Sequence, residues 1–297
     1  MKKISTTAYM VASGLVKLSE LPRWSQYFTP DIVQLNRAFI EHSKDTSAKH
    51  FVNWLSPAAA CWLVNFMFIP GMVEHYLFRK LWIERQLAAA IQKGVRQVVV
   101  LGGGFDTLAL RRAKKHTEVE FFEIDLPITQ HTKISILQQI GYAIPENCRF
   151  KAADLSQKAL GAILLTDYHF KQDAPTLVIL EGVLMYLDEA EVKGLFADLR
   201  RLFNGHLQIL FGAIAAPDAK SNIAMRITNA LLGRAAEATR WHCSISGMPA
   251  FISELGFSIK ELISYKDLQK AYRNEKELRQ VPDEDENYYI VTKSPQT

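Results

Sequence analysis

Short apolar runs alternate with amphipathic stretches along most of the chain from about residue 95 onward. The run over 95–101 is rich in β-branched residues and ends in glycines, which is typical of a buried strand. Further strands are expected at 119–125, 149–153, 176–180 and 206–211, with helices over 104–115, 128–140 and 188–203. Two weaker strands are predicted at 257–264 and 288–293, and the charged stretch 283–286 before the last one is expected to be a loop.

Near-continuous apolar strands separated by helices predict a mostly parallel sheet covered on both faces, which is a doubly wound α/β fold. The first 90 residues differ, because they are mainly helical in pattern, rich in aromatic residues and interrupted by prolines. We expect them to cover the edge of the sheet at which ligands bind, outside the carboxyl ends of the strands. No linker or internal repeat divides the chain, so a single domain is predicted.

The 35 basic and 31 acidic residues are well mixed, and the net charge of +4 does not indicate a nucleic-acid partner. The doublets Arg111-Arg112 and Lys114-Lys115 are expected to form a solvated helix face. The three cysteines show no CxxC spacing and the eight histidines no HExxH pairing, so neither a disulfide framework nor a metal site is indicated. This composition favours a reduced, metal-free, cytoplasmic protein.

The apolar stretch over 57–73 raises the question of a membrane segment. It is short for a span, and Asn65, Pro70 and Gly71 interrupt it. A buried helix or a pocket cover is therefore predicted there, with no stable membrane insertion. The polar residues that follow Met1-Lys2-Lys3 do not form the apolar core of a secretory signal.

The glycine-rich segment LGGGFDT, residues 101–107, follows the first predicted strand directly. Gly102 and Gly104 allow a sharp turn and a close approach of the backbone to a ligand, and the next helix begins with unpaired N–H groups. A tight turn without a ligand is the alternative, since a glycine-rich turn alone is a weak signal. Asp125, 21 residues after Gly104, ends the second strand, where an acid can accept hydrogen bonds from both ribose hydroxyls.

That arrangement suits any cofactor that contains adenosine, so NAD is an alternative. The dinucleotide pattern GxGxxG requires a third glycine, and this chain has Thr107 at that position. Asp106 would also repel a pyrophosphate. A carboxylate at this position suits a phosphate-free cofactor with an ammonium group, which points to S-adenosylmethionine.

Two further acidic positions follow later strands. Asp154, at the end of the third strand, could accept the exocyclic amine of adenine while Leu155 packs on the ring, although Asp154 could equally cap the next helix. Glu181, before Gly182 at the end of the fourth strand, could attract an ammonium or a sulfonium charge, or be a capping or loop acid.

Several blocks of the sequence together resemble the leucine carboxyl methyltransferase family, including bacterial members described as S-adenosylmethionine-dependent methyltransferases. The blocks are TTAYMVA at 6–12, FRKLWIE at 78–84, GVRQVVVLGGGFDTLALR at 94–111, FFEIDLP at 121–127, Asp154-Leu155, and LEGVLMYL at 180–187. EIDLP and EGVLMYL are more specific than the glycine turn. The resemblance covers about residues 1–215.

The resemblance implies a seven-stranded, Rossmann-like fold of class I methyltransferases that binds S-adenosylmethionine. The pattern of elements along the chain predicts a helical cover (1–90), a cofactor-binding core (91–215), a substrate-side insertion (216–250) and the last strands (251–297). Residue by residue, the resemblance implies cofactor-binding roles for Arg79, Gly102, Asp125, Asp154, Leu155 and Glu181. Together with Gly104 and Asp106 of the glycine turn, these residues form the predicted cofactor-binding set. Arg79 matches an anchor for the methionine carboxylate or for a substrate carboxylate, with a surface salt bridge as the alternative.

The chain departs from the family at positions that concern the acceptor more than the cofactor. Many relatives have an arginine where Ser156 stands, and an arginine or threonine where Leu108 stands. Members that act on a protein C-terminus use an N-terminal lysine, and Lys17 lies in that region without a secure match.

The acceptor is predicted to be a carboxylate, on a small molecule or a peptide terminus, because a carboxylate is ionised at neutral pH and needs no general base. The sequence offers only His242 and Tyr186 as bases, and structural roles are expected for both. An aromatic set, Trp54, Trp62, Phe66, Phe68, Tyr76 and Trp82, could line an apolar acceptor pocket or simply pack helices on the sheet. The alternatives are an NAD(P)-dependent oxidoreductase and a non-catalytic binding protein of the same fold.

Overall fold

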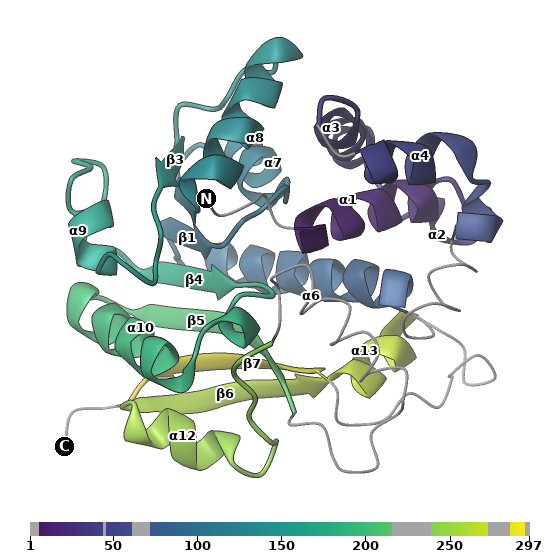
Figure 1. Ribbon diagram of the computed structural model, residues 1–297. Coiled ribbons are helices and arrows are strands. Elements are labelled where there is room, and N and C mark those ends of the chain that lie inside the picture. Colours follow the sequence, from purple (N-terminus) through teal and green to yellow (C-terminus); the bar gives the residue numbers. More distant parts are fainter. Residues whose placement is uncertain (1–5, 44–45, 61–71, 216–238, 273–285, 295–297) are drawn as a thin grey trace.

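The computed structural model describes residues 6–43, 46–60, 72–215, 239–272 and 286–294. Its centre is a seven-stranded sheet in the order β3-β2-β1-β4-β5-β7-β6, in which β7 is antiparallel to both of its neighbours (Figure 1). The strands are β1 (Gln97–Leu101), β2 (Glu120–Asp125), β3 (Cys148–Ala152), β4 (Thr176–Leu180), β5 (Leu207–Ile214), β6 (Phe257–Ser264) and β7 (Glu286–Lys293). The predicted fold class, a doubly wound and mostly parallel α/β sheet of seven strands, is confirmed.

Helices cover both faces of this sheet (Figure 1). One hydrophobic core joins the sheet to α1 (Thr6–Ser19), α3 (Pro30–Glu41), α6 (Met72–Gln92), α7 (Leu108–Lys115), α8 (Pro127–Gln139) and α13 (Tyr265–Tyr272). A second core, on the other face, contains α9 (Leu160–Leu164), α10 (Glu189–Leu202) and α12 (Met248–Glu254). Among the described residues, α2 (Pro22–Ser25) and α4 (Thr46–Trp54) also contribute to the first core, and the short 3-10 helix η1 (Leu184–Tyr186) contributes to the second.

The observed elements differ from the predicted ones mainly at their ends. The β4 and β6 bounds agree with the prediction, whereas α7 begins four residues later than predicted because Gly104 has a positive φ of 52°. β7 begins at Glu286, so the prediction that Glu286 belongs to a loop is wrong. Its side chain is buried in contact with His75, Arg79 and Tyr288.

The N-terminal elements are helical, as predicted, and Pro22 and Pro30 stand at the first positions of α2 and α3, where a missing N–H costs nothing. The start of α1 lies over the glycine turn, since a Cβ on Gly104 would be 3.4 Å from the Ala8 Cβ. The long helix α6 instead lies along one face of the sheet and belongs to its core. The division of the chain at 90, 215 and 250 stays a prediction.

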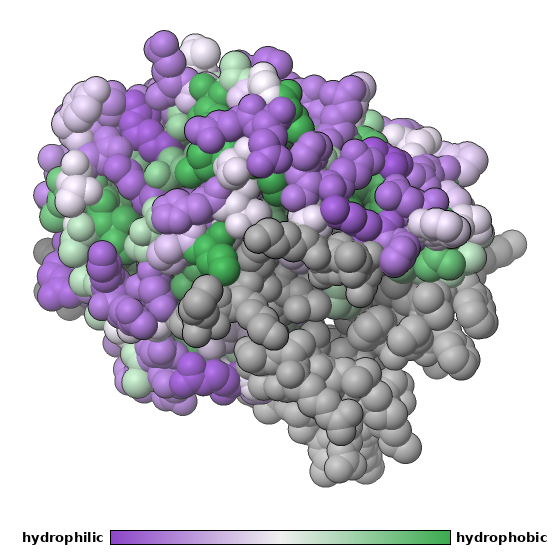
Figure 2. Space-filling model, turned by 45° about the horizontal axis from the view of Figure 1, so that its top comes forward, coloured by the Kyte–Doolittle hydropathy of each residue, from purple (hydrophilic) through white to green (hydrophobic). Residues whose placement is uncertain are grey.

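Two stretches that the sequence singled out lie mostly outside the described residues. They are the apolar stretch 57–73, of which 61–71 are not described, and the predicted insertion, of which 216–238 are not described. None of the helices that the structure describes combines the length and apolar character needed to cross a bilayer. On the face shown in Figure 2, hydrophilic residues predominate over the part not drawn in grey, and hydrophobic residues show in separate patches.

The prediction that Arg111 and Arg112 form a solvated helix face is wrong. Both guanidinium groups pair with the carboxylate of Glu84 on α6, and Arg111 is buried. The doublet therefore joins two helices, and only Lys114 and Lys115 form the expected solvated face.

Candidate functional site

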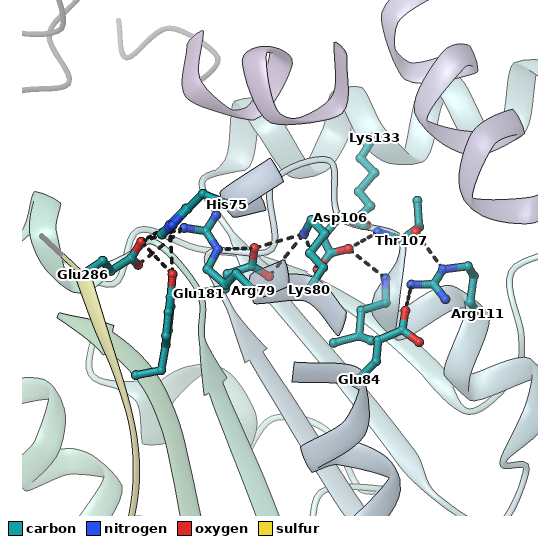
Figure 3. A network of polar contacts seen from close by, with 12 residues as sticks. His75, Arg79, Lys80, Glu84, Asp106, Thr107, Arg111, Lys133, Glu181 and Glu286 are labelled. Carbon is teal, nitrogen blue, oxygen red and sulfur yellow. Dashed lines mark hydrogen bonds and ion pairs between the residues drawn. The ribbon is translucent and has the colours of Figure 1, made fainter. Parts of the chain in front are cut away.

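Three of the residues predicted for the site meet at the carboxyl edge of the sheet. Gly102 follows β1, Asp125 is the last residue of β2, and Glu181 follows β4. Because β2, β1 and β4 are neighbours and run parallel, their ends bring these residues side by side. The residues between Gly102 and α7, among them Asp106, lie at the same edge as Glu181 (Figure 3).

Two features of the protein itself explain why the turn contains glycines. Gly102 and Gly104 have φ values of 67° and 52°, which side chains rarely adopt. A Cβ on Gly102 would also lie 2.4 Å from Cγ2 of Val183, in the segment after β4. Packing against Val183 therefore requires a glycine at position 102, in addition to any requirement from a ligand.

Asp125 holds the glycine turn against β2. Its Oδ2 accepts the N–H of Gly104 at 2.6 Å, and its Oδ1 accepts the N–H of Leu126 at 2.6 Å. Burial raises the pKa of Asp125, and these two N–H groups oppose that rise. Thr129 donates a side-chain hydrogen bond to the same carboxylate. A carboxylate has about four acceptor sites, so about one remains for a hydroxyl donor.

Asp106 lies directly before Thr107, the N-cap residue of helix α7. Its Oδ1 accepts the N–H groups of Thr107 at 2.6 Å and Leu108 at 3.1 Å, and its Oδ2 lies 3.2 Å from Nζ of Lys80. Burial disfavours the carboxylate charge, but Lys80, with further help from Arg111 and Lys133, lowers the pKa of Asp106 to about 2. The carboxylate is thus ionised and already has an ammonium partner within the chain.

Arg79 and Lys80 of α6 share the carboxylate of Glu181 (Figure 3). Arg79 donates through Nε at 2.9 Å, and Nζ of Lys80 lies 3.1 and 3.2 Å from the two oxygens. Burial alone would lower the pKa of Arg79, but Glu181 and Glu286 raise it well above its ordinary value. Only 8% of Arg79 is exposed, so it does not form the surface salt bridge that was the alternative.

Gly182 leaves space in front of the Arg79 guanidinium. A Cβ on Gly182 would lie 3.9 Å from Nη2 and 4.0 Å from Nη1, the two terminal nitrogens. These two nitrogens form the fork that binds a carboxylate with parallel hydrogen bonds. The fork therefore faces the position that a side chain at residue 182 would fill.

Glu286, His75 and Tyr288 form a cluster that the sequence did not reveal. Oε2 of Glu286 lies 2.5 Å from Nε2 of His75 and accepts the Tyr288 hydroxyl at 2.9 Å, while Nη1 of Arg79 lies 3.4 Å away (Figure 3). Burial opposes the charge of Glu286, but Arg79 and His75 lower its pKa to about 2. Glu286 was missed because it ends an acidic run, which is typical of a loop.

Asp154 and Leu155 lie beyond β3 at the same edge. Oδ1 of Asp154 accepts the backbone N–H of Ser156 at 3.1 Å and its hydroxyl at 2.7 Å, which holds the turn after β3. The alternative, that Asp154 caps the next helix, is wrong, because the N-cap of α9 is Ala159. Leu155 is partly buried against the second core. Their contact with an adenine ring stays a prediction.

Lys17 is not brought to the site. Its Nζ pairs with Glu20 at 3.0 Å, near the end of α1 opposite to Ala8. Tyr186 donates its hydroxyl to Oγ1 of Thr7 at 3.2 Å, which joins the segment after β4 to the start of α1. His242 contacts Thr239 at 3.1 Å, and burial lowers its pKa.

The aromatic set predicted for an acceptor pocket is divided in the structure. Trp54 is 81% exposed, whereas Trp82 is buried, with its ring centre 5.5 Å from that of Tyr288. Trp62, Phe66 and Phe68 lie outside the described residues. A separate pocket of about 350 Å³ lies along the outer strand β3, away from the acids at the edge, and is lined by Arg149, Phe150, Lys151, Thr166, Asp167, Tyr168 and His169.

The family model for leucine carboxyl methyltransferase matches residues 41–200, more than half of the chain. The chain belongs to this family. The match includes Arg79, the glycine turn, Asp125, Asp154-Leu155 and Glu181, and it ends before β5.

Curated relatives carry names of the same kind. A Bacillus subtilis (strain 168) protein, YktD, is 31% identical over 123 residues, which cover 41% of this chain and 40% of YktD. A Mycobacterium sp. (strain KMS) protein is 28% identical over 187 residues, which cover 62% of this chain and 58% of the relative. Both are provisionally named S-adenosyl-L-methionine-dependent methyltransferases, and the chain spans about half the length of the curated relatives it matches.

Two solved structures share the fold at 12% sequence identity. A protein from Thermobifida fusca YX, provisionally described as a methyltransferase, has a TM-score of 0.59 and covers 88% of this chain and 93% of its own. A DUF574 family protein from Streptomyces avermitilis MA-4680 has a TM-score of 0.61 and covers 88% and 96%. The fold is therefore that of the class I, Rossmann-like type expected from the sequence.

Proposed function

We propose that this protein is an S-adenosylmethionine-dependent O-methyltransferase that converts a carboxylate into a methyl ester. Family membership supports the reaction class, and the names of the relatives support the methyl donor. The acidic groups at the ends of β2 and β4 suit a ligand with hydroxyl donors and positive charge.

The position of Asp106 is the observation that favours S-adenosylmethionine over a dinucleotide cofactor. In a dinucleotide fold the pyrophosphate binds the free N–H groups at the start of the helix after β1. Here the Asp106 carboxylate accepts the N–H groups of Thr107 and Leu108 and adds a negative charge at that point. A pyrophosphate would meet both repulsion and a lack of donors, whereas a phosphate-free nucleoside would not.

The residues fit S-adenosylmethionine in the following roles. Asp125 would accept a ribose hydroxyl, Asp154 and Leu155 would contact adenine, and the fork of Arg79 over Gly182 would bind the methionine carboxylate. Glu181 and Asp106 would attract the ammonium group, and Gly102 and Gly104 would keep the turn low beneath the ligand. When bound, the cofactor supplies an electrophilic methyl group on its sulfonium.

A carboxylate acceptor needs no proton removed before it attacks, so the chain has to orient it, exclude water and neutralise its charge. The acceptor would be a small molecule or a peptide terminus. The His75–Glu286 pair favours a second candidate, a hydroxyl acceptor, because a histidine held by a carboxylate is a common general base. The cytoplasmic location and the lack of a nucleic-acid partner stay predictions.

Calorimetric titration with S-adenosylhomocysteine and with NADH tests the cofactor. We expect binding of the first alone, and a melting temperature raised by a few degrees at about 100 times Kd. Asp125→Asn should weaken S-adenosylhomocysteine binding at least about tenfold, because hydrogen bonds to a charged acceptor are lost. Asp198→Asn is the matched control, since Asp198 accepts the N–H of Leu160 away from the site.

The stability of the product towards alkali tests the acceptor. Methyl groups transferred from labelled S-adenosylmethionine to a carboxylate are released as methanol by mild base, whereas methyl ethers survive. Ester formation with a panel of carboxylic acids is expected. If all products are stable to base, the acceptor is a hydroxyl group and not a carboxylate. Binding of NADH in place of S-adenosylhomocysteine would contradict the proposal as a whole.

A further inference from the structure

We propose that Glu286, held by His75 and Tyr288, is a positioning residue that orients the Arg79 guanidinium for the carboxylate of the cofactor's amino-acid tail. This inference rests on the proposed function, because it assumes that S-adenosylmethionine binds at this edge. It adds a group from the last strand, β7, which lies outside the part of the chain that the family model matches.

Glu286 is fixed more firmly by its own neighbours than by Arg79. Its Oε2 lies 2.5 Å from His75 and 2.9 Å from the Tyr288 hydroxyl, whereas Nη1 of Arg79 lies 3.4 and 3.5 Å from its two oxygens. The anchors come from α6 and from β7 itself, so the carboxylate keeps its place whether or not Arg79 has another partner.

Two restraints on Arg79 determine the plane of its guanidinium. Glu181 accepts from Nε at 2.9 Å, and Glu286 attracts Nη1 from the β7 side. One of these contacts alone would allow the group to swing about its Nε bond. With both in place, Nη1 and Nη2 stay directed towards the open position at Gly182, at nearly equal distances of 4.0 and 3.9 Å.

The sheet makes room for this carboxylate. A Cβ on Gly212, in the neighbouring strand β5, would lie 2.6 Å from Oε1 of Glu286. The side chains of Glu286 and Glu181 are 10% and 11% exposed, so two largely buried carboxylates flank one guanidinium. Lys80 shares Glu181 with Arg79, and Glu286 supplies a second carboxylate to Arg79 from the β7 side.

The test compares two ligands that differ in the amino-acid tail. S-Adenosylhomocysteine has the tail carboxylate, and 5′-methylthioadenosine lacks the tail. For Glu286→Gln, which removes the charge but keeps the shape, we expect Kd for S-adenosylhomocysteine to rise about tenfold and Kd for 5′-methylthioadenosine to change less than about twofold. Tyr288→Phe removes one anchor of Glu286 without touching Arg79, and should show the same pattern with a smaller change.

Glu261→Gln is the matched control, because Glu261 also joins α6 to the sheet, through Gln86 at 2.8 Å and Trp82 at 3.4 Å, and does not contact Arg79. It should leave both Kd values unchanged. If Glu286→Gln weakens the binding of both ligands equally, Glu286 has only a structural role. If it tightens the binding of S-adenosylhomocysteine, Glu286 competes with the tail carboxylate for Arg79 and does not position it. Failure of the unaltered protein to bind either ligand would overturn the proposed function itself.

Discussion

Buried carboxylates at the carboxyl edge differ in proton affinity because their partners differ. Asp106 and Glu286 each face a cation, and their pKa values fall to about 2. Asp125 is paired with backbone N–H groups, and burial raises its pKa. At the scale of single residues, burial acts to raise the pKa of all three acids, and the facing cations outweigh that effect only at Asp106 and Glu286.

The charge of Asp106 should contribute to stability in a pH-dependent way. Its folded pKa of about 2 lies below the ordinary 3.8, so its stabilisation is full above pH 3.8 and disappears as the pH falls through about 2. We expect Asp106→Asn, which keeps a side-chain acceptor oxygen, to lower the free energy of unfolding at pH 7 by on the order of 2 kcal/mol. Urea unfolding should show about half of this difference at pH 3. A difference that does not change between pH 7 and pH 3 would rule out the charge as its cause.

Helix α6 is the element that connects the site to the rest of the fold. His75 and Arg79 are four residues apart and share one stripe, as do Lys80 and Glu84. The first stripe contacts β7 and the end of β4, and the second contacts the Asp106 turn and α7 (Figure 3). Helix α6 thus links the predicted cofactor-binding acids Asp106 and Glu181 to strand β7, which the sequence did not place at the site.

Glu84 should be important for the joint between α6 and α7. Its carboxylate pairs with Arg111 and Arg112, and despite burial these arginines lower its pKa. Because its removal leaves the largely buried Arg111 without an acid, we expect Glu84→Gln to lower the free energy of unfolding by about 2–4 kcal/mol in denaturant titration. Glu189→Gln, which removes an exposed pairing with Lys193, should cost less than about 1 kcal/mol. Equal losses would mean that burial of the pair is unimportant.

At the scale of the whole molecule, a buried ion pair lies beneath the glycine turn. Lys133 of α8 and Glu123 of β2 are 0% and 1% exposed, with Nζ and Oε1 2.6 Å apart. Lys133 also donates to the carbonyl oxygen of Asp106, and a Cβ on Gly103 would lie 2.6 Å from the Glu123 Cδ. Sheet, helix and turn therefore meet at this pair.

Burial raises the pKa of Glu123 to about 7, and Lys133 only partly offsets this. The folded protein thus holds this proton more tightly than the unfolded chain, so the contribution of Glu123 falls as the pH rises from 4.5 to about 7. Lys133→Met leaves the buried acid without a cation and should cost about 3–5 kcal/mol at pH 8. The loss should shrink at pH 5, where Glu123 takes up a proton.

A double variant distinguishes the contribution of the charges of Lys133 and Glu123 from that of their packing. Lys133→Met combined with Glu123→Gln removes both charges, and we expect it to recover at least about half of the loss measured for Lys133→Met alone in thermal and urea unfolding at pH 8. A double variant as unstable as the single one would show that Lys133 acts through packing.

Local sequence patterns were enough to predict the architecture and the acids that follow the parallel strands. The apolar runs at 176–180 and 257–264 predicted β4 and β6 with their observed bounds, because buried strands leave a local pattern. Gly102, Asp125 and Glu181 could be placed at one edge for a similar reason, since the carboxyl ends of neighbouring parallel strands must meet there.

Tertiary structure alone decided the partners of these residues. His75 and Glu286 are 211 positions apart, and nothing in either local sequence indicates their contact. The same holds for Arg79 with Glu181, and for Glu84 with Arg111. Hydrophobic periodicity is a local property that records which face is buried, whereas an ion pair depends on how separate elements are packed, and only the folded chain specifies that packing.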